Sequence, residues 1–488
     1  MPDPTAPPPA GAVEHRRHER AGAGGWRGPA LDLALRLLRP ATRRELALLR
    51  RLDWAPAGEV RALHEERLEA LLLHAFGQTD YYREVLGDLG VVRGGRVDLG
   101  RFGEIPVLTK EVIREQGGRL RARALPPGRR AFENRTGGST GQPTVYWQDS
   151  GYWDVNVATK LYHFEVLGKR LGEAELKVWG SERDVTLETS NWKARLERWL
   201  YNRRIALCHR LGEAEVRGIV DEVNRFRPRT VWGYVDALYT IAQYARAMGL
   251  EIRHPPAAVL GGGGTMFPPM REAIRRAFGA PAVDFYGSRE MGDVACECAL
   301  TAGLHVSMNS HRVEVLDPRG RGLVEEEGDL VLTSLHNYAM PFIRYQIGDR
   351  GRLAAGGCPC GRGTPLLASI GGRAVEAFIR ADGAVVPPAL LVGAVRVLVD
   401  PDLIGRVQFV QEDYARVVVR IVPAAGASEE GLRARCDAIG GRVRELMGPG
   451  CEVLFERVPE IPPTSSGKYL YTVSKVEPLT PGLGRYVA

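Results

Sequence analysis

The chain has 488 residues, 44% of them hydrophobic, so it is long enough to bury a large core and to form roughly two to four domains. Its 66 Lys and Arg residues against 59 Asp and Glu residues give a net charge of +7. The two signs are interspersed and no nucleic-acid-binding motif accompanies them, so we expect no nucleic-acid partner. Seven cysteines, an odd number, argue against a disulfide framework and favour a reducing compartment.

Residues 1–29 are rich in Pro, Ala, Gly and Arg and predict a disordered leader. They lack the apolar core of a secretory signal, and no window reaches the roughly 18 to 20 apolar residues of a membrane span, so we expect a cytoplasmic protein. Apolar residues at helical spacing predict two amphipathic helices, at 31–52 and 59–76. The Arg-rich first helix fits either contact with a membrane surface or an ordinary packed helix with a solvated face.

Gly, Pro, Thr and Ser dominate 119–145 and predict a loop. Its centre consists of Thr136, Gly137, Gly138, Ser139, Thr140 and Gly141. Backbone N–H and hydroxyl groups in such a loop can surround phosphate oxygens, although the spacing is not that of a Walker loop. Taken alone, the segment is more often a flexible connection.

Further along, short apolar runs at 231–233, 257–260 and 283–285 alternate with helical patterns at 235–248 and 269–278. This alternation predicts a mostly parallel sheet with helices packed on it. The four glycines that follow the second run include Gly262 and Gly263, where the lack of side chains would let adenine lie against backbone. A plain mobile loop fits the same glycines.

The pattern then changes to period-two strands at 313–316 and 329–333, which predict a small β-rich subdomain. Closer to the C-terminus, strand-like runs at 407–410 and 417–422 precede a helical stretch near 429–446. We expect these last elements to form a separate α+β unit.

Five short motifs occur in the order in which adenylate-forming ligases carry them. They are 136–141, Tyr286-Gly287-Ser288-Arg289-Glu290, Arg344 to Asp349, Gly372-Arg373 and Gly467-Lys468. With the segments 81–83 and 105–110, they make the chain resemble the phenylacetate-CoA ligase and CapK-like branch over residues 60–475. The resemblance implies an α/β protein: a large N-terminal adenylate-forming domain of mixed sheets and helices at 30–372, and a small mobile α+β C-terminal lid at 373–488.

The resemblance also implies how ATP is bound. The loop from Thr136 to Gly141 would hold the β- and γ-phosphates, although Gln142 stands where the family often has Lys. Tyr286 would stack on adenine, Gly287 would belong to the same ATP-binding segment, Ser288 and Arg289 would flank the phosphates, and Glu290 would bind Mg²⁺. Asp349 would accept hydrogen bonds from the ribose hydroxyls. The alternative for Glu290 is an ordinary surface carboxylate, and the alternative for Asp349 is a cap on a turn.

Lys468 matches the lid lysine that, in relatives, bridges the carboxylate and the α-phosphate. Gly372 and Arg373 would mark the hinge about which the lid rotates to admit a thioester-forming face. Glu376 lies near the position where relatives often carry Asp or Lys, which leaves the pivot residue open.

Cysteines cluster between 296 and 360. Cys296 or Cys298 with His305, Cys358 and Cys360 could form one tetrahedral zinc site. The resemblance selects Cys298, and the closed Cys₃His set would staple two loops rather than catalyse. The alternative is that the thiols pack as small hydrophobes. Cys208, Cys436 and Cys451 have no partner spacing and are expected to be structural.

These features predict an enzyme that uses ATP and Mg²⁺ to convert a small-molecule carboxylic acid, first of all an aryl or arylacetic acid, to acyl-AMP, and that transfers the acyl group to coenzyme A. Gly233, Tyr234 and 179–181 would line the acid pocket. The acceptor could instead be an amine, a hydroxyl or a carrier protein. A non-catalytic, zinc-stapled nucleotide-binding protein is the rival from another class. A monomer or a homodimer fits the sequence equally.

Overall fold

The computed structural model describes residues 25–135, 144–179, 192–208, 211–300, 302–373, 378–386, 391, 399–400, 402–462, 470–476 and 485–486. Most of the predicted leader, the predicted phosphate loop and Lys468 lie outside these residues. None of the described helices is long and apolar enough to cross a membrane.

Three helices open the described chain: α2 (Arg27–Leu38), α3 (Pro40–Leu52) and α4 (Ala57–Gln78). The prediction of one helix over 31–52 is wrong, because Pro40 occupies the first turn of α3 and Arg39 before it leaves the helical conformation, at φ −140° and ψ 61°. Proline disfavours helical backbone in the preceding residue, so the chain turns there. Helix α2 begins inside the stretch predicted to be leader.

A small helical layer follows. It consists of α5 (Asp80–Asp88), the strands β1 (Val92–Arg93) and β2 (Arg96–Val97), the 3₁₀ helix η1 (Leu99–Glu104) and α6 (Lys110–Leu120). Thr79 and Thr109 cap α5 and α6, because each hydroxyl accepts a hydrogen bond from a backbone N–H of the first turn. The segment predicted to be a continuous loop then contains β3 (Ala131–Arg135), which pairs in antiparallel fashion with β4 (Val145–Asp149). Asp149 caps α7 (Ser150–Val166).

The central sheet has eleven strands in the order β12-β13-β14-β15-β11-β10-β9-β8-β7-β5-β6. Its parallel part consists of β5 (Glu175–Trp179), β6 (Arg203–Leu207), β7 (Thr230–Tyr234), β8 (Ala258–Gly262) and β9 (Ala282–Ser288). The helices between these strands are α9 (Trp192–Leu200), α10 (Glu213–Phe226), α11 (Val235–Ala247) and α12 (Pro268–Phe278). The alternation of strand and helix predicted from the sequence is confirmed.

Alternating side chains bury both faces of this parallel part. Val231 and Val259 point into a core with α10, α11 and α12, whereas Trp232 and Leu260 point to the other face and meet Phe164 of α7. Strands covered on both faces read as short continuous apolar runs, which is why their positions could be predicted.

The remaining strands continue the same sheet in antiparallel fashion. They are β10 (Gly292–Glu297), β11 (Leu304–Val306), β12 (His311–Leu316), β13 (Gly328–Ser334), β14 (Tyr345–Leu353) and β15 (Leu366–Arg373). The predicted β-rich subdomain is therefore an extension of the central sheet rather than a sheet of its own. Its core packs against α4, α5 and α6 through residues such as Leu71, Leu86 and Tyr345.

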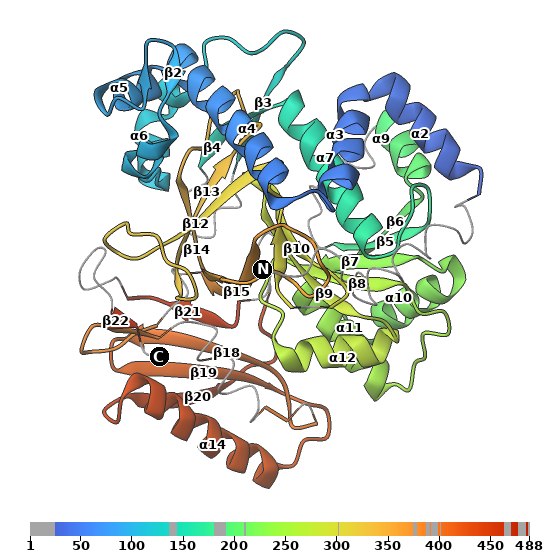
Figure 1. Cartoon of the computed structure of the whole chain (residues 1–488). Coiled ribbons are helices and arrows are strands. Elements are labelled where there is room, and N and C mark those ends of the chain that lie inside the picture. The colour runs from blue at the N-terminus through green and yellow to red at the C-terminus, as the bar shows by residue number, and fades with distance from the viewer. Residues whose placement is uncertain are drawn as a thin grey trace.

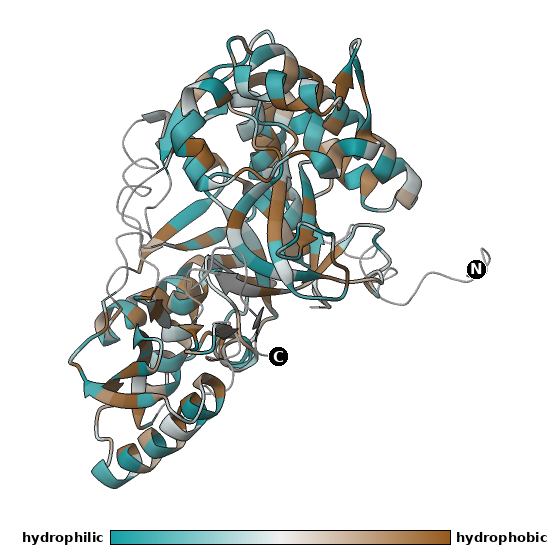
Figure 2. Cartoon of the chain, turned by 90° about the vertical axis from the view of Figure 1, so that its left-hand side faces the viewer, coloured by the Kyte–Doolittle hydropathy of each residue, from teal (hydrophilic) through white to brown (hydrophobic). Residues whose placement is uncertain are grey.

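The C-terminal elements form a separate lobe below the larger body (Figure 1), and Figure 2 shows the same separation from the side. A four-stranded sheet in the order β20-β19-β18-β21 comprises β18 (Ile404–Asp413), β19 (Arg416–Pro423), β20 (Glu452–Arg457) and β21 (Thr472–Ser474). Helix α14 (Glu429–Met447) packs on it, with Phe409, Val419 and Ile439 in a core of their own. Three short strands, β16 (Phe378–Ile379), β17 (Ala384–Val386) and β22 (Arg485–Tyr486), form a second sheet. The predicted α/β fold with a small α+β C-terminal unit is confirmed.

Candidate adenylation site

A tight turn between β9 and β10 carries Arg289 and Glu290. Ser288 and Gly292 are paired across the turn, and the Ser288 hydroxyl accepts a hydrogen bond of 3.1 Å from the Met291 N–H. Gly292 lies at φ +73°, and a Cβ atom there would stand 2.4 Å from the Asn156 amide oxygen. The turn therefore requires glycine at this position, which fixes how Glu290 is presented.

Tyr286 of β9 and Asp349 of β14 meet beside this turn. The Tyr286 hydroxyl donates a hydrogen bond of 2.7 Å to Asp349 Oδ2, and Asp349 is the strand partner of Arg373 at the end of β15. The residue predicted to stack on adenine, the residue predicted to bind ribose and a predicted hinge residue thus come together from three separate strands. The hinge itself was predicted at Gly372 and Arg373, and both lie within β15.

Glu290 is buried, and its Oε1 lies 3.4 Å from the Tyr345 hydroxyl. Burial raises the pKa of Tyr345, and the nearby Glu290 carboxylate raises it further, so the phenol stays protonated and can donate to Glu290. Within the described part of the chain, no Lys or Arg side chain pairs with this carboxylate. A buried acid in such a setting is suited to a divalent cation.

Gln148 ties the turn to the β3–β4 hairpin. Its side chain is fully buried, and its amide nitrogen donates hydrogen bonds of 3.1 Å to the carbonyl oxygens of both Arg289 and Glu290. Its amide oxygen accepts a hydrogen bond of 2.8 Å from Asn134 on β3. One side chain therefore connects the two strands that flank the predicted phosphate loop with the turn that carries Glu290.

Helix α7 and strand β12 hold the same turn from the other side. The Tyr152 hydroxyl lies 3.4 Å from the Glu290 carbonyl oxygen, and Asn156 accepts a hydrogen bond of 2.9 Å from the Asp293 N–H. His311 Nε2 lies 2.6 Å from the Met291 carbonyl oxygen. Since a carbonyl only accepts, His311 carries its proton on Nε2. Burial lowers the pKa of His311 to about 4, so the ring is neutral at pH 7.

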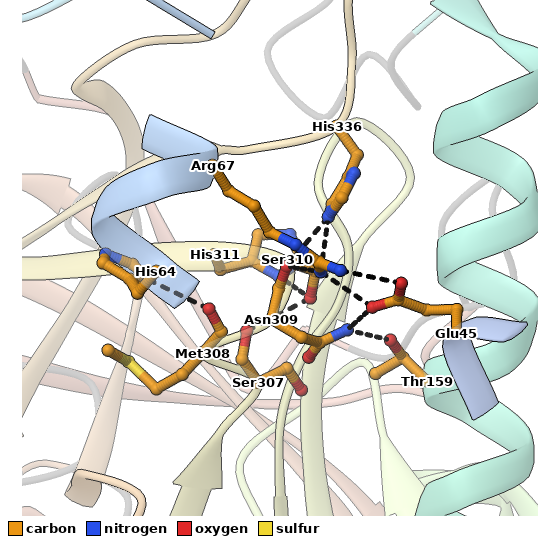
Figure 3. Close-up of polar contacts among 10 residues, drawn as sticks. All are labelled: Glu45, His64, Arg67, Thr159, Ser307, Met308, Asn309, Ser310, His311 and His336. Atoms are coloured by element: carbon orange, nitrogen blue, oxygen red, sulfur yellow. Dashed lines mark hydrogen bonds and ion pairs between the residues drawn. The ribbon is translucent and has the colours of Figure 1, made fainter. Parts of the chain in front are cut away.

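His311 belongs to a buried polar network on the 307–311 segment (Figure 3). Arg67 of α4 reaches the Asn309 carbonyl oxygen at 2.5 Å and forms an ion pair of 2.8 Å with Glu45 of α3. His336 Nε2 lies 2.8 Å from the same Asn309 carbonyl, and burial lowers the pKa of His336 to about 3. The first helices are thereby fixed to the segment that leads to His311.

The predicted phosphate-loop residues from Thr136 to Gly141 lie outside the described residues, as do Lys468 and Glu376. The strands on either side of the loop are described, and Arg135 at the end of β3 pairs with Val145 at the start of β4. The interpretation of these residues stays a prediction.

The carboxyl ends of the parallel strands adjoin the turn, which is where open α/β sheets bind ligands. Tyr234 at the end of β7 stacks on Trp179 at the end of β5, with ring centroids 4.2 Å apart and planes 22° from parallel. Gly233 beside it has no room for a side chain, because a Cβ atom would lie 2.3 Å from the Val178 carbonyl oxygen. The predicted wall of the acid pocket is thus aromatic, and Ser181 lies outside the described residues.

The predicted adenine-contacting glycines lie at the end of β8. A Cβ atom on Gly262 would lie 2.6 Å from the Phe285 ring, and Gly263 adopts φ +72°. Gly262 is the last residue of β8 rather than part of a loop. These constraints explain the glycines without a ligand, and adenine contact stays a prediction.

Cys298, His305, Cys358 and Cys360 come together as predicted, with one candidate ligand atom from each within 4.8 Å of all the others. Cys298 Sγ lies 3.7 Å from Cys358 Sγ, and Cys360 Sγ lies 3.5 Å from His305 Nε2. Ligands about 2.3 Å from one ion in a tetrahedron stand roughly 3.8 Å apart, so the set fits zinc. Cys296, the strand partner of His305, packs with Phe164 and Trp232 and is not one of the four.

The surroundings of this Cys/His cluster are also ordered. His305 Nδ1 lies 2.8 Å from the Thr364 hydroxyl, which orients the ring. Arg362 donates to Cys360 Sγ at 3.6 Å and forms a buried ion pair of 2.7 Å with Asp53 at the end of α3. A hydrogen bond from the Cys298 thiol lowers the pKa of Cys360. The cluster therefore joins the first helical layer to the central sheet.

Comparison with known proteins finds one matching family model and several similar proteins. Residues 378–475 match the model of the CapK C-terminal domain. CapK of Staphylococcus aureus is 23% identical over 85% of this chain and 89% of its own length, and a phenylacetate-coenzyme A ligase of Thermus thermophilus is 28% identical over 67% of this chain and 73% of its own. The chain is therefore similar in sequence to CapK and to phenylacetate-coenzyme A ligases. The solved structure of a 2-hydroxyisobutyryl-CoA ligase in complex with an acyl-AMP has a similar fold, at a TM-score of 0.67 and 21% identity over 84% of this chain and 88% of the other.

The motif residues could be found from the sequence, but the side chains that hold them in place could not. Gln148, Tyr152, Asn156 and His311 lie in no motif that we recognised. The contact between Gln148 and Glu290 spans 142 positions, and only the packed fold brings it about. A glutamine directly after the apolar and aromatic residues Val145 to Trp147 of β4 is the one local signal.

Proposed function

We propose that this chain activates a carboxylic acid with ATP, forming acyl-AMP and pyrophosphate, and then transfers the acyl group to the thiol of coenzyme A. The observation that carries the proposal is the convergence of Tyr286, Glu290 and Asp349 beside the carboxyl ends of the parallel strands. The relatives named as coenzyme A ligases, and the neighbour that holds an acyl-AMP, support the same chemistry.

In the first half-reaction, an oxygen of the substrate carboxylate attacks the α-phosphorus of ATP, and the bond to the pyrophosphate oxygen breaks. Asp349 accepts hydrogen bonds from the ribose hydroxyls, and its contact with Tyr286 orients the carboxylate for this role. Glu290 would hold Mg²⁺, which supplies positive charge against the triphosphate. Lys468 would lie between the two anions as they approach each other.

In the second half-reaction, the thiolate sulfur attacks the acyl carbon and AMP leaves. An amine, a hydroxyl or a carrier-protein thiol would react in the same way, so the acceptor is the least specified part of the proposal. The stacked pair of Trp179 and Tyr234 favours a flat substrate, in agreement with an aryl or arylacetic acid.

Cys298, His305, Cys358 and Cys360 would hold a structural zinc ion. Four protein ligands leave no open position for water, so the ion would fix the loops and contribute to folding stability. The contacts of Arg362 with Cys360 and Asp53 support this role, because a guanidinium offsets the negative charge of a three-thiolate site.

The test is exchange of labelled pyrophosphate into ATP in the presence of a panel of carboxylic acids, followed by thioester formation with coenzyme A. Lys468→Ala should abolish exchange and retain ATP binding. Lys475→Ala is the matched control, since Lys475 is another lysine of the C-terminal lobe and pairs with Glu412 at 2.7 Å. ATP binding without acid-dependent exchange for any acid would favour the non-catalytic alternative.

A further inference from the structure

Helix α2 carries both buried and exposed leucines. Leu31 and Leu35 face inward and pack against Leu46 and Leu49 of α3. Leu33 and Leu37 face outward, and Leu38 ends the helix; Leu37 and Leu38 are 72% and 74% exposed. Large apolar side chains that are exposed side by side have the composition of a contact surface.

Helix α9 extends this surface. Trp192, Leu196 and Trp199 recur at intervals of four and three residues and therefore lie along one stripe, and Trp192 is 68% exposed. The Trp26 ring lies 5.2 Å from the Trp199 ring and joins the stripe to α2. Figure 1 shows α2 and α9 side by side at the outer edge of the larger body. We call the exposed side chains of Trp26, Leu33, Leu37, Leu38, Trp192, Leu196 and Trp199 the Trp/Leu face.

The chain around this face is strongly basic. Residues 26–52 contain seven arginines and two carboxylates. One carboxylate, Glu45, is buried against Arg67, and the other, Asp32, is shared between Arg36 and Arg43. Arg27 lies against the rings of both Trp26 and Trp199, 5.4 and 5.5 Å from their centroids. Arg39 also pairs with Asp154 and with Glu197 of α9, and Arg50 pairs with Glu165. Even with these acids counted, guanidinium groups outnumber carboxylates around the apolar surface.

We propose that the Trp/Leu face docks this protein onto the surface of an anionic lipid bilayer. Tryptophan rings favour the boundary between headgroups and acyl chains, leucines bury their side chains just below it, and arginines pair with lipid phosphates. A second copy of the chain fits less well, because a two-fold contact through this face would bring the two sets of arginines together.

The experiment is flotation of the full chain with lipid vesicles. We expect it to float with vesicles of equal parts phosphatidylglycerol and phosphatidylcholine, to bind pure phosphatidylcholine more weakly, and to be released as salt is raised. Leu37→Asp with Leu38→Asp should lower the partition coefficient by about 100-fold. Val324→Asp is the matched control: Val324 is 57% exposed in the connection between β12 and β13, and its replacement should leave binding unchanged.

A direct readout in the unaltered protein is quenching of tryptophan fluorescence by lipids brominated in their acyl chains, which requires the indole rings to enter the bilayer. Failure to bind anionic vesicles, binding by the double aspartate variant equal to that of the unaltered protein, or absence of quenching would each overturn the proposal. So would a dimer in solution that the double variant dissociates, because the face would then belong to a second copy.

Discussion

Replacing Gln148 by Leu would remove the side chain that joins the β3–β4 hairpin to the turn bearing Glu290. The two backbone carbonyls of residues 289 and 290 would lose a donor, and the Asn134 amide would lose its acceptor. Each buried polar group left without a partner costs about 1–3 kcal/mol. Tyr152 still reaches the Glu290 carbonyl, and Leu contributes apolar packing, so we expect a net loss of about 2–4 kcal/mol in the free energy of unfolding.

The functional loss should exceed the loss of stability. A displacement of Glu290 by about 1 Å is expected to lower the rate of pyrophosphate exchange about 100-fold, and to weaken binding of ATP with Mg²⁺ as well. Affinity for ATP, measured by calorimetry with and without Mg²⁺, reports on the turn even before an acid substrate is found. Urea unfolding gives the stability term separately.

Two further variants separate positioning from packing. Gln411→Leu removes an equally buried amide from the C-terminal lobe, where it bonds both backbone groups of Ile379, so it should lower stability and leave ATP affinity intact. Gln148→Glu keeps the size and the acceptor for Asn134 but loses the donors to the turn. If Gln148→Glu binds ATP and Mg²⁺ as tightly as the unaltered chain, the reasoning is refuted.

Three other outcomes follow from the site. Cys358→Ser should remove the zinc proposed for the Cys/His cluster and lower the melting temperature, as elemental analysis and thermal unfolding would report. A variant that kept a full zinc ion would contradict the assignment. Asp349→Asn should weaken ATP binding by about 10- to 100-fold, because a charge-assisted acceptor for ribose is lost; unchanged affinity would remove Asp349 from the site. Burial lowers the pKa of His163 and His311 to about 4 and that of His336 to about 3, against roughly 6.5 in the unfolded chain. Below pH 6.5 the unfolded state therefore binds more protons than the folded state. The free energy of unfolding should be at its full value above about pH 6.5 and fall by up to ~4 kcal/mol per pH unit toward pH 4. A urea midpoint that stays constant across that window would contradict the burial of these three rings.

Local patterns were enough to predict three of the five parallel strands, β7, β8 and β9, and to gather the residues of the Cys/His cluster, whereas the choice of Cys298 over Cys296 came from the resemblance. Strands such as β7 and β8 are covered on both faces, so they consist mostly of consecutive apolar residues. Cys358 and Cys360 are two positions apart, so their pairing is visible in the sequence. The break at Pro40 was missed because the apolar periodicity continues through it.

The contacts that support the site could not be predicted from local patterns. Arg362 and Asp53 are 309 positions apart, and neither residue type is unusual in its segment. Such pairs depend on how whole layers pack, which no local period encodes. The same holds for the extension of the central sheet by β12 to β15, since their alternation predicts strands but not the edge that they join.

The chain leaves the central sheet through β15, whose final residue is the strand partner of Asp349. Asp349, which is proposed to bind the ribose, and the end of β15, from which the chain continues to the C-terminal lobe, therefore belong to one ladder of backbone hydrogen bonds. Thermodynamic reciprocity then applies: if a filled nucleotide site favours one orientation of the lobe, a ligand or antibody that fixes that orientation must tighten nucleotide binding by the same factor.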